Sequence, residues 1–124
     1  MDQVQITPLD PSFADNRGET YELENNRSTN LVLCVRNANT ISGRHYHTGI
    51  SKNKDPEVIY LIQGKVFFRW RKLNEEKIQE RIVMGPSQFI VPIQIWHELE
   101  TITDAIFLEL NSLEDGKKDT TKLE

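Results

Sequence analysis

Residues 43–64 read GRHYHTGISKNKDPEVIYLIQG and decide the fold of this 124-residue chain. His45 and His47 are two positions apart, so they lie on one face if the segment is a strand, because side chains alternate along a strand with a period of two. Glu57 follows ten residues after His47 and opens an apolar, strand-like run. His97 is the third and last histidine, and it lies in a second strand-like stretch that ends in WHELE. All the histidines of the chain therefore fall within two such segments.

The residue types in these two segments are those of a metal site. Imidazole nitrogens and one carboxylate oxygen that converge from neighbouring strands suit a divalent first-row transition metal. Three imidazoles with an optional carboxylate also leave positions open for water or substrate, as a catalytic site requires. We therefore predict that His45, His47, Glu57 and His97 bind nickel, iron, manganese or zinc. Two alternatives stay open: the histidines can be hydrogen-bonded barrel residues without metal, and Glu57 can be the polar start of a strand after a long loop.

Composition excludes several classes of protein. The formal net charge of -4 and the pI near 5.4 argue against a nucleic-acid partner, which favours a basic patch or stripe. No apolar run is long enough to cross a bilayer, and the N-terminus has neither the basic nor the apolar region of a secretory signal. Cys34 is the single cysteine, which fits a reducing compartment, and it reads as a small buried hydrophobe. These features predict a cytoplasmic protein without membrane partners.

Short strands separated by turn residues dominate the pattern along the chain. We count eight to ten of them and no convincing helix, which predicts an all-β sandwich or closed barrel. Residues 31–110 are expected to form the barrel of a single domain, and residues 1–30 an N-terminal arm of strands that packs on it. Residues 111–124 are polar and read as a tail that is flexible unless it docks. Residues 48–56 read as an exposed loop with solvated lysines.

The two histidine segments resemble the two motifs of the cupin superfamily. The first motif is matched by His45-Tyr46-His47 and by Glu57 followed after six residues by Gly64, and the second by Gly85, Pro92 and His97. The resemblance covers about residues 31–110 and implies a double-stranded β-helix, the cupin jelly-roll barrel. Three departures stand out: the loop between His47 and Glu57 is longer than the family pattern, and Asn39 and Gln94 stand at expected glycine positions.

A narrower resemblance is to cupins of nucleotide-sugar and capsular-polysaccharide pathways, including nucleotide-sugar epimerases. The segment DNRG at 15–18 is similar to one in which the family's arginine meets the nucleotide-sugar phosphates, which implies substrate binding by Arg17. The segment SGRHYH at 42–47 is similar to one whose histidine is the catalytic base, which implies that role for His45. Arg44 lies beside it and can hold phosphate or carboxylate through its planar fork. For the family's catalytic tyrosine the chain offers Tyr60, with Tyr46 as the other inward candidate.

The sequence leaves two exclusive roles for His45 and three candidate functions for the protein. A metal-bound nitrogen cannot take a proton, so His45 is either a ligand or, without metal, a general base. The leading prediction is a metal-binding cupin that acts on a small carbohydrate-like substrate as an isomerase or epimerase. The alternatives are a metal-dependent dioxygenase and a non-catalytic small-ligand-binding cupin. We also predict a homodimer, because a small barrel gains by covering a sheet edge. Trp96 adjoins His97 and so faces the opposite side, which predicts an outer tryptophan that a partner can cover.

Overall fold

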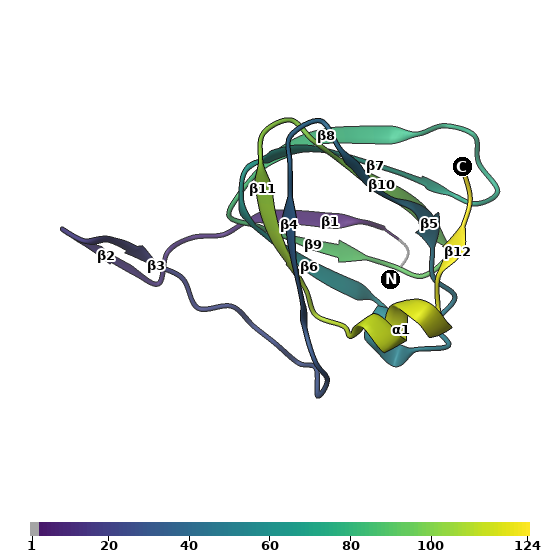
Figure 1. Cartoon of the computed structure of the whole chain (residues 1–124), viewed down its shortest axis with the longest axis horizontal. Helices are drawn as coiled ribbons and strands as arrows, with labels where there is room; N and C mark the ends of the chain where they lie inside the picture. The colour runs from purple at the N-terminus through teal and green to yellow at the C-terminus, as the bar shows by residue number, and fades with distance from the viewer. Residues whose placement is uncertain (1–2) are drawn as a thin grey trace.

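The computed structural model describes residues 3–124, and two antiparallel sheets packed face to face make up the body of the molecule (Figure 1). The first sheet has the order β1 (Gln5–Pro8), β9 (Ser87–Val91), β6 (Glu57–Gln63), β11 (Ala105–Glu109), β4 (Val32–Arg36). The second sheet has the order β12 (Thr121–Lys122), β5 (Ile41–Tyr46), β10 (Ile95–Thr101), β7 (Lys65–Lys72), β8 (Gln79–Met84). The remaining elements are the hairpin β2 (Phe13–Asp15) and β3 (Gly18–Thr20), the 3-10 turn η1 (Lys52–Lys54) and the helix α1 (Leu113–Lys118).

The core fills the space between the two sheets. It is built by the alternate, inward-facing residues of each strand, among them the fully buried Leu61, Val66, Phe68 and Phe89. Strand β7 follows the alternation in the sequence, with Val66 and Phe68 buried between less buried neighbours. Cys34 is buried as predicted, and burial raises the pKa of its thiol to about 11. The all-β prediction is confirmed.

The N-terminal arm packs on the barrel in part. Strand β1 pairs with β9, and Leu9 and Leu23 pack against the cluster around Tyr60. The predicted turn at residues 15–18 connects β2 to β3, and this hairpin projects from the body of the molecule (Figure 1) with every residue of both strands exposed. Its tip is therefore far from the core of its own chain.

The C-terminal residues are an ordered part of the fold rather than a free tail. Ser112 caps α1 through a reciprocal pair of hydrogen bonds with Asp115, and β12 then pairs with the edge of β5. The last residues cover Trp96, whose indole N–H donates to the carbonyl of Leu123. Trp96 is consequently 6% exposed, and the expectation of an outer tryptophan open to a partner is wrong.

The two departures from the cupin glycine pattern have a common backbone geometry. Asn39 and Gln94 both have a φ of 62°, in the left-handed region that glycine enters without strain. Asn39 and Gln94 therefore adopt, in this chain, a backbone conformation that favours glycine.

No helix among residues 3–124 has the length and apolarity needed to span a membrane. The cytoplasmic location stays a prediction.

Candidate metal site

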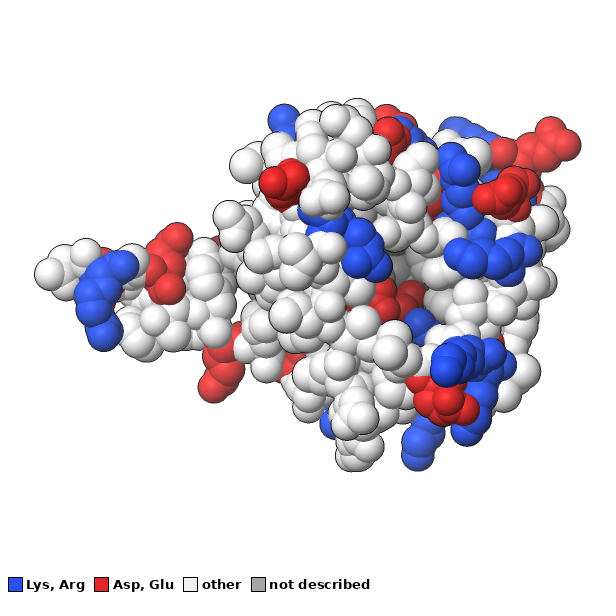
Figure 2. All heavy atoms as spheres, viewed as in Figure 1, with Lys and Arg blue, Asp and Glu red and all other residues white. Residues whose placement is uncertain are grey.

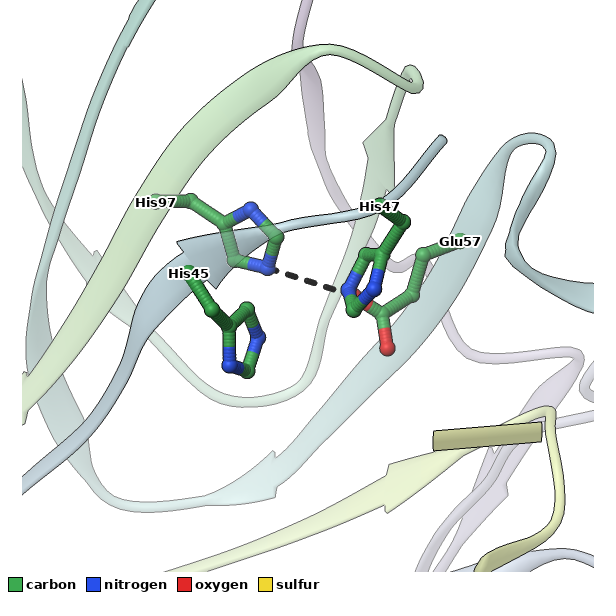
Figure 3. Close-up of side chains that lie close together, drawn as sticks. All are labelled: His45, His47, Glu57 and His97. Carbon is green, nitrogen blue, oxygen red and sulfur yellow. Dashed lines mark hydrogen bonds and ion pairs between the residues drawn. The ribbon is translucent and has the colours of Figure 1, made fainter. Parts of the chain in front are cut away.

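The structure brings all four predicted ligands together between the two sheets. His45 in β5 lies opposite His97 in the neighbouring strand β10, and His47 follows directly after β5. Glu57 is the first residue of β6 in the facing sheet, so the long loop does not keep it from the cluster. One candidate ligand atom from each residue lies within 4.8 Å of the others, and the side chains point toward one another (Figure 3).

His47 is held in one protonation pattern by the main chain. Its Nδ1 is hydrogen-bonded to the carbonyl oxygen of Asp119. A carbonyl oxygen can only accept, so Nδ1 carries the proton and the neutral ring presents an Nε2 lone pair. That Nε2 lies 3.1 Å from Oε1 of Glu57, which is also an acceptor.

His97 repeats this arrangement. Its Nδ1 donates to the carbonyl of Ile95 over 3.0 Å, and its Nε2 lies 3.3 Å from the same Oε1 of Glu57. Two imidazole lone pairs and a carboxylate oxygen therefore converge on one point, and they repel one another unless a proton or a cation lies between them. The buried Nδ1 of His45 has no hydrogen-bond partner among the described residues. This donor set fits a divalent cation, with Nδ1–H bonds to carbonyls orienting two of the rings as metal-bound histidines require.

The second oxygen of Glu57 is neutralised from the opposite side. Oε2 accepts from Lys54 Nζ over 2.8 Å and from the side-chain amide of Asn111 over 3.2 Å. Burial by itself raises the pKa of Glu57. A proton held between its carboxylate and His47 or His97, together with the charge of Lys54, acts in the opposite direction, and the pKa lies well below its usual value. Lys54 is buried, so the prediction that the lysines of the 48–56 loop are all solvated is wrong for this residue.

His45 is a neutral imidazole at physiological pH. Burial, followed by the neighbouring His97 and His47, lowers its pKa to about 3. A base is efficient when its pKa lies near the working pH, so this environment suits a ligand better than a general base.

Solved structures with the same architecture share this barrel. A TDP complex of a double-mutant QdtA 3,4-ketoisomerase from Thermoanaerobacterium thermosaccharolyticum has a TM-score of 0.69 and 20% sequence identity, with 96% of this chain and 86% of that chain covered. A 3,4-ketoisomerase from Helicobacter canadensis has a TM-score of 0.67 and 18% identity, with 89% and 83% covered. The capsular polysaccharide assembling protein CapF from Staphylococcus aureus has a TM-score of 0.64 and 21% identity, and the match spans 94% of this chain but 34% of CapF. The fold is a cupin barrel. No protein-family model and no curated protein sequence matches the chain.

A cavity of the cupin barrel adjoins the cluster and contains an acid that the sequence reasoning missed. Its lining combines polar and apolar side chains: Ser42, His45, Glu57, His97 and Glu109 with Ile59, Phe68, Leu99 and Phe107. Glu109 reaches it because Ala105, Phe107 and Glu109 alternate inward along β11, a signal already present in the sequence. Burial, with the nearby charge of Glu57, raises the pKa of Glu109 to about 7. An acid with such a pKa can both take up and release a proton at neutral pH.

The structure does not bring Arg17, Arg44 or Tyr60 to this cavity. Arg17 is on the projecting hairpin and pairs with Asp15, and its side chain is 79% exposed. Arg44 pairs with Glu98 over 3.2 Å. Arg44 precedes the inward His45 and Glu98 follows the inward His97, so both side chains face away from the cavity. Figure 2 shows acidic and basic side chains interspersed over one face of the cupin barrel, with a hollow in its body.

Tyr60 belongs to a second, smaller apolar cluster outside the barrel interior, with Val58 and Leu110. Its hydroxyl donates to the carbonyl of Glu24 over 2.7 Å and accepts from Gln88 over 3.0 Å. The first hydrogen bond fastens the N-terminal segment to the sheet, and the second joins β6 to β9. Tyr60 therefore has a structural surrounding and not the catalytic one that the resemblance implied.

Proposed function

We propose that this chain is a cupin that binds a divalent transition metal and isomerises a keto-sugar carried on a nucleotide. The observation that carries the metal part is the pair of imidazoles, His47 and His97, that main-chain carbonyls fix with their lone pairs toward the carboxylate of Glu57. The isomerase part is supported by the acid Glu109 in the adjoining cavity and by the ketoisomerases that have this fold.

The proposed reaction moves a carbonyl to the next carbon of the sugar ring. A base removes the proton from the carbon next to the carbonyl, and the electron pair of that C–H bond forms a C=C bond while the carbonyl oxygen takes up a proton. Loss of the hydroxyl proton on the neighbouring carbon and protonation of the former carbonyl carbon complete the shift, so no atom is gained or lost. A bound divalent ion would polarise the carbonyl and stabilise the negative charge that develops on its oxygen.

In this chain we assign the carbon-to-carbon proton transfer to Glu109. We take His45 as a ligand and not as the base, because the nitrogen that binds the metal cannot also accept a proton and a pKa of about 3 is poorly matched to a base at neutral pH. Glu109 lines the same cavity as His45 and Glu57, and its pKa of about 7 suits a group that takes up and returns a proton. The apolar lining limits water at the reacting carbon.

A nucleotide-sugar is the substrate class we propose. A QdtA mutant has been solved with TDP-4-keto-6-deoxyglucose, and other QdtA structures contain TDP. The same sugar nucleotide is therefore the first substrate to offer this chain.

Metal content and proton exchange together test the proposal. The protein is purified without chelator and its metals are measured by elemental analysis, beside the double variant His45→Ala, His47→Ala and the surface variant Arg17→Ala. We expect about one ion per chain in the wild type and in Arg17→Ala, and none in the double variant. The metal-loaded protein is then incubated with TDP-4-keto-6-deoxyglucose in deuterium oxide, and NMR follows the exchange of the proton next to the carbonyl.

Each outcome separates the functions that the sequence left open. Deuterium uptake that Glu109→Gln abolishes supports the isomerase. If the protein binds metal but catalyses no deuterium exchange, and its iron form consumes oxygen only with substrate, the dioxygenase replaces the isomerase as the function. Ligand binding without turnover by any metal form leaves a binding protein. A folded protein without metal overturns the metal site and returns His45 to the role of base.

We also propose that two chains form a homodimer through the edge of the first sheet. Strand β4 ends this sheet, and its outward side chains Leu33 and Val35 are 64% and 67% exposed. The projecting β2–β3 hairpin is exposed along its length, and an isolated two-stranded hairpin is only marginally stable in water. A second copy that packs on both would bury the exposed apolar side chains of β4 and support the hairpin.

A further inference from the structure

The C-terminal segment, residues 111–123, follows an unusual path along the candidate metal site. It leaves β11, forms α1 below the barrel and returns as β12 beside β5 (Figure 1). The sequence offers no apolar periodicity here, and the segment is nevertheless ordered by polar contacts. Those contacts reach three of the four residues of the cluster, the neighbour of the fourth, and the loop between His47 and Glu57.

Asp119 anchors the segment to the 48–56 loop. Its carboxylate accepts hydrogen bonds from the backbone N–H groups of Thr48 (2.7 Å), Gly49 (2.9 Å) and Ser51 (3.1 Å), and from the Thr48 hydroxyl (3.0 Å). The residue is 2% exposed, so these bonds are made away from water. One carboxylate thereby fixes the start of the insertion that separates His47 from Glu57.

The same segment reaches His47 and Glu57 themselves. The main-chain carbonyl of Asp119 accepts from His47 Nδ1, which turns Nε2 toward the cluster. The side-chain amide of Asn111, 1% exposed, donates to Glu57 Oε2 over 3.2 Å. The first bond orients the imidazole of His47 and the second the carboxylate of Glu57, and the opposite atom of each group faces the other ligands.

The strands that hold the remaining two ligands are also fastened by it. In β12, Lys122 lies opposite His45 in the pairing with β5. The carbonyl of Leu123 accepts from the indole of Trp96, the residue before His97. Every candidate ligand is thus contacted by residues 111–123 or adjoins a residue that they contact.

We infer that residues 111–123 are a clasp that holds the four ligands in a metal-binding arrangement, with Asp119 and Asn111 as its positioning residues. The inference rests on the proposed metal site and adds to it a part of the chain that supplies no ligand of its own. Hydrogen bonds of this kind, from ligands to the groups behind them, are worth about 10–100-fold in metal affinity.

Metal affinity is the measurement that tests the clasp. Chelator-treated wild type, Asp119→Ala, Asn111→Ala and the control Glu114→Ala are titrated with Co²⁺ and Zn²⁺ against a chromophoric chelator. Glu114 lies in the exposed first turn of α1 and makes none of these contacts. We expect affinity to fall by about 10–100-fold in Asp119→Ala and Asn111→Ala and to stay unchanged in Glu114→Ala. Amide hydrogen exchange is measured on the same samples, where Asp119→Ala should accelerate exchange at Thr48, Gly49 and Ser51.

The outcomes distinguish the clasp from the metal site on which it rests. Wild-type affinity in folded Asp119→Ala and Asn111→Ala overturns the clasp and leaves the metal site in place. A wild type that binds neither ion overturns both. Should Asp119→Ala not fold, Asn111→Ala decides alone, because it removes a single hydrogen bond to Glu57.

Discussion

Lys54 Nζ lies 2.8 Å from Oε2 of Glu57, and the side chains of both residues are at most 5% exposed. The other oxygen of the same carboxylate faces the imidazoles of His47 and His97. Glu57 thus has a permanent cation on one side and the candidate metal position on the other. The charge of Lys54 favours the ionised carboxylate whether or not a metal is bound. Glu57 is therefore a carboxylate that can bind a metal ion without first losing a proton.

Replacing Lys54 by methionine should destabilise the metal-free protein. The substitution keeps the length of the side chain but leaves a buried carboxylate without its counter-ion, which costs about 3 kcal/mol in the free energy of unfolding. Urea denaturation of the chelator-treated protein measures the difference, and addition of metal should recover part of it. The control is Lys52→Met, an exposed lysine of the same 3-10 turn, which should leave stability unchanged. A Lys54→Met variant as stable as the wild type would show that Glu57 does not need the ion pair.

The barrel and the ligand cluster were predictable because both depend on local pattern. A continuous apolar run identifies β6, and alternation with a period of two identifies β7. Two histidines two residues apart must share a face of their strand. Glu57 is grouped with these histidines because a carboxylate at the start of an apolar strand is costly to bury unless a cation pairs with it. Short-range rules of this kind also gave the turn at residues 15–18 and the burial of Cys34.

The clasp was not predictable because its partners are distant and polar. Asp119 and Thr48 are 71 positions apart, and a hydrogen bond between a carboxylate and backbone N–H groups leaves no periodic trace in either segment. For the same reason Lys54 read as a solvated loop residue. Tyr60 shows the opposite error. It lies between the inward Ile59 and Leu61, so alternation alone places it on the outer side of β6, whereas the family resemblance implies an inward tyrosine.

The change Tyr60→Phe should affect stability and not metal binding. It removes the hydroxyl that bridges the carbonyl of Glu24 and the amide of Gln88, and leaves a partly buried donor and acceptor to find other partners. A loss of about 1–2 kcal/mol in the free energy of unfolding is expected. Metal affinity and the rate of proton exchange in the substrate should equal those of the wild type. A large loss of exchange activity at unchanged metal affinity would restore Tyr60 to the catalytic role that the resemblance implied.

Glu109→Gln should remove a pH dependence from the stability of the metal-free protein. Burial and then the charge of Glu57 raise the pKa of Glu109 from its usual 4.5 to about 7, against the opposite effects of Lys54, His97 and Arg36. Between these two values the folded chain keeps a proton that the unfolded chain has lost, so stability falls as the pH rises through this window. At about 1.4 kcal/mol per pKa unit the loss amounts to at most about 3 kcal/mol.

Urea midpoints at about pH 5 and about pH 7.5, measured for wild type and Glu109→Gln, test this sign. All other titrating groups are common to the two proteins, so only the difference between them reports Glu109. Wild type should lose more stability than the variant over the interval. Equal losses would place the Glu109 carboxyl in water and remove it from the proton-transfer role.

Leu33→Lys should separate the proposed dimer into single chains. Leu33 projects from β4, the last strand of the first sheet, and a lysine there places a charge in the surface that the second copy is proposed to cover. Size-exclusion chromatography with light scattering should give twice the chain mass of 14.4 kDa for the wild type and the single-chain mass for Leu33→Lys. The matched control is Ile82→Lys, because Ile82 is 55% exposed on β8 at the edge of the other sheet. A wild type that elutes as one chain at micromolar concentration, or a dimer that Ile82→Lys disrupts and Leu33→Lys does not, would contradict the β4 interface.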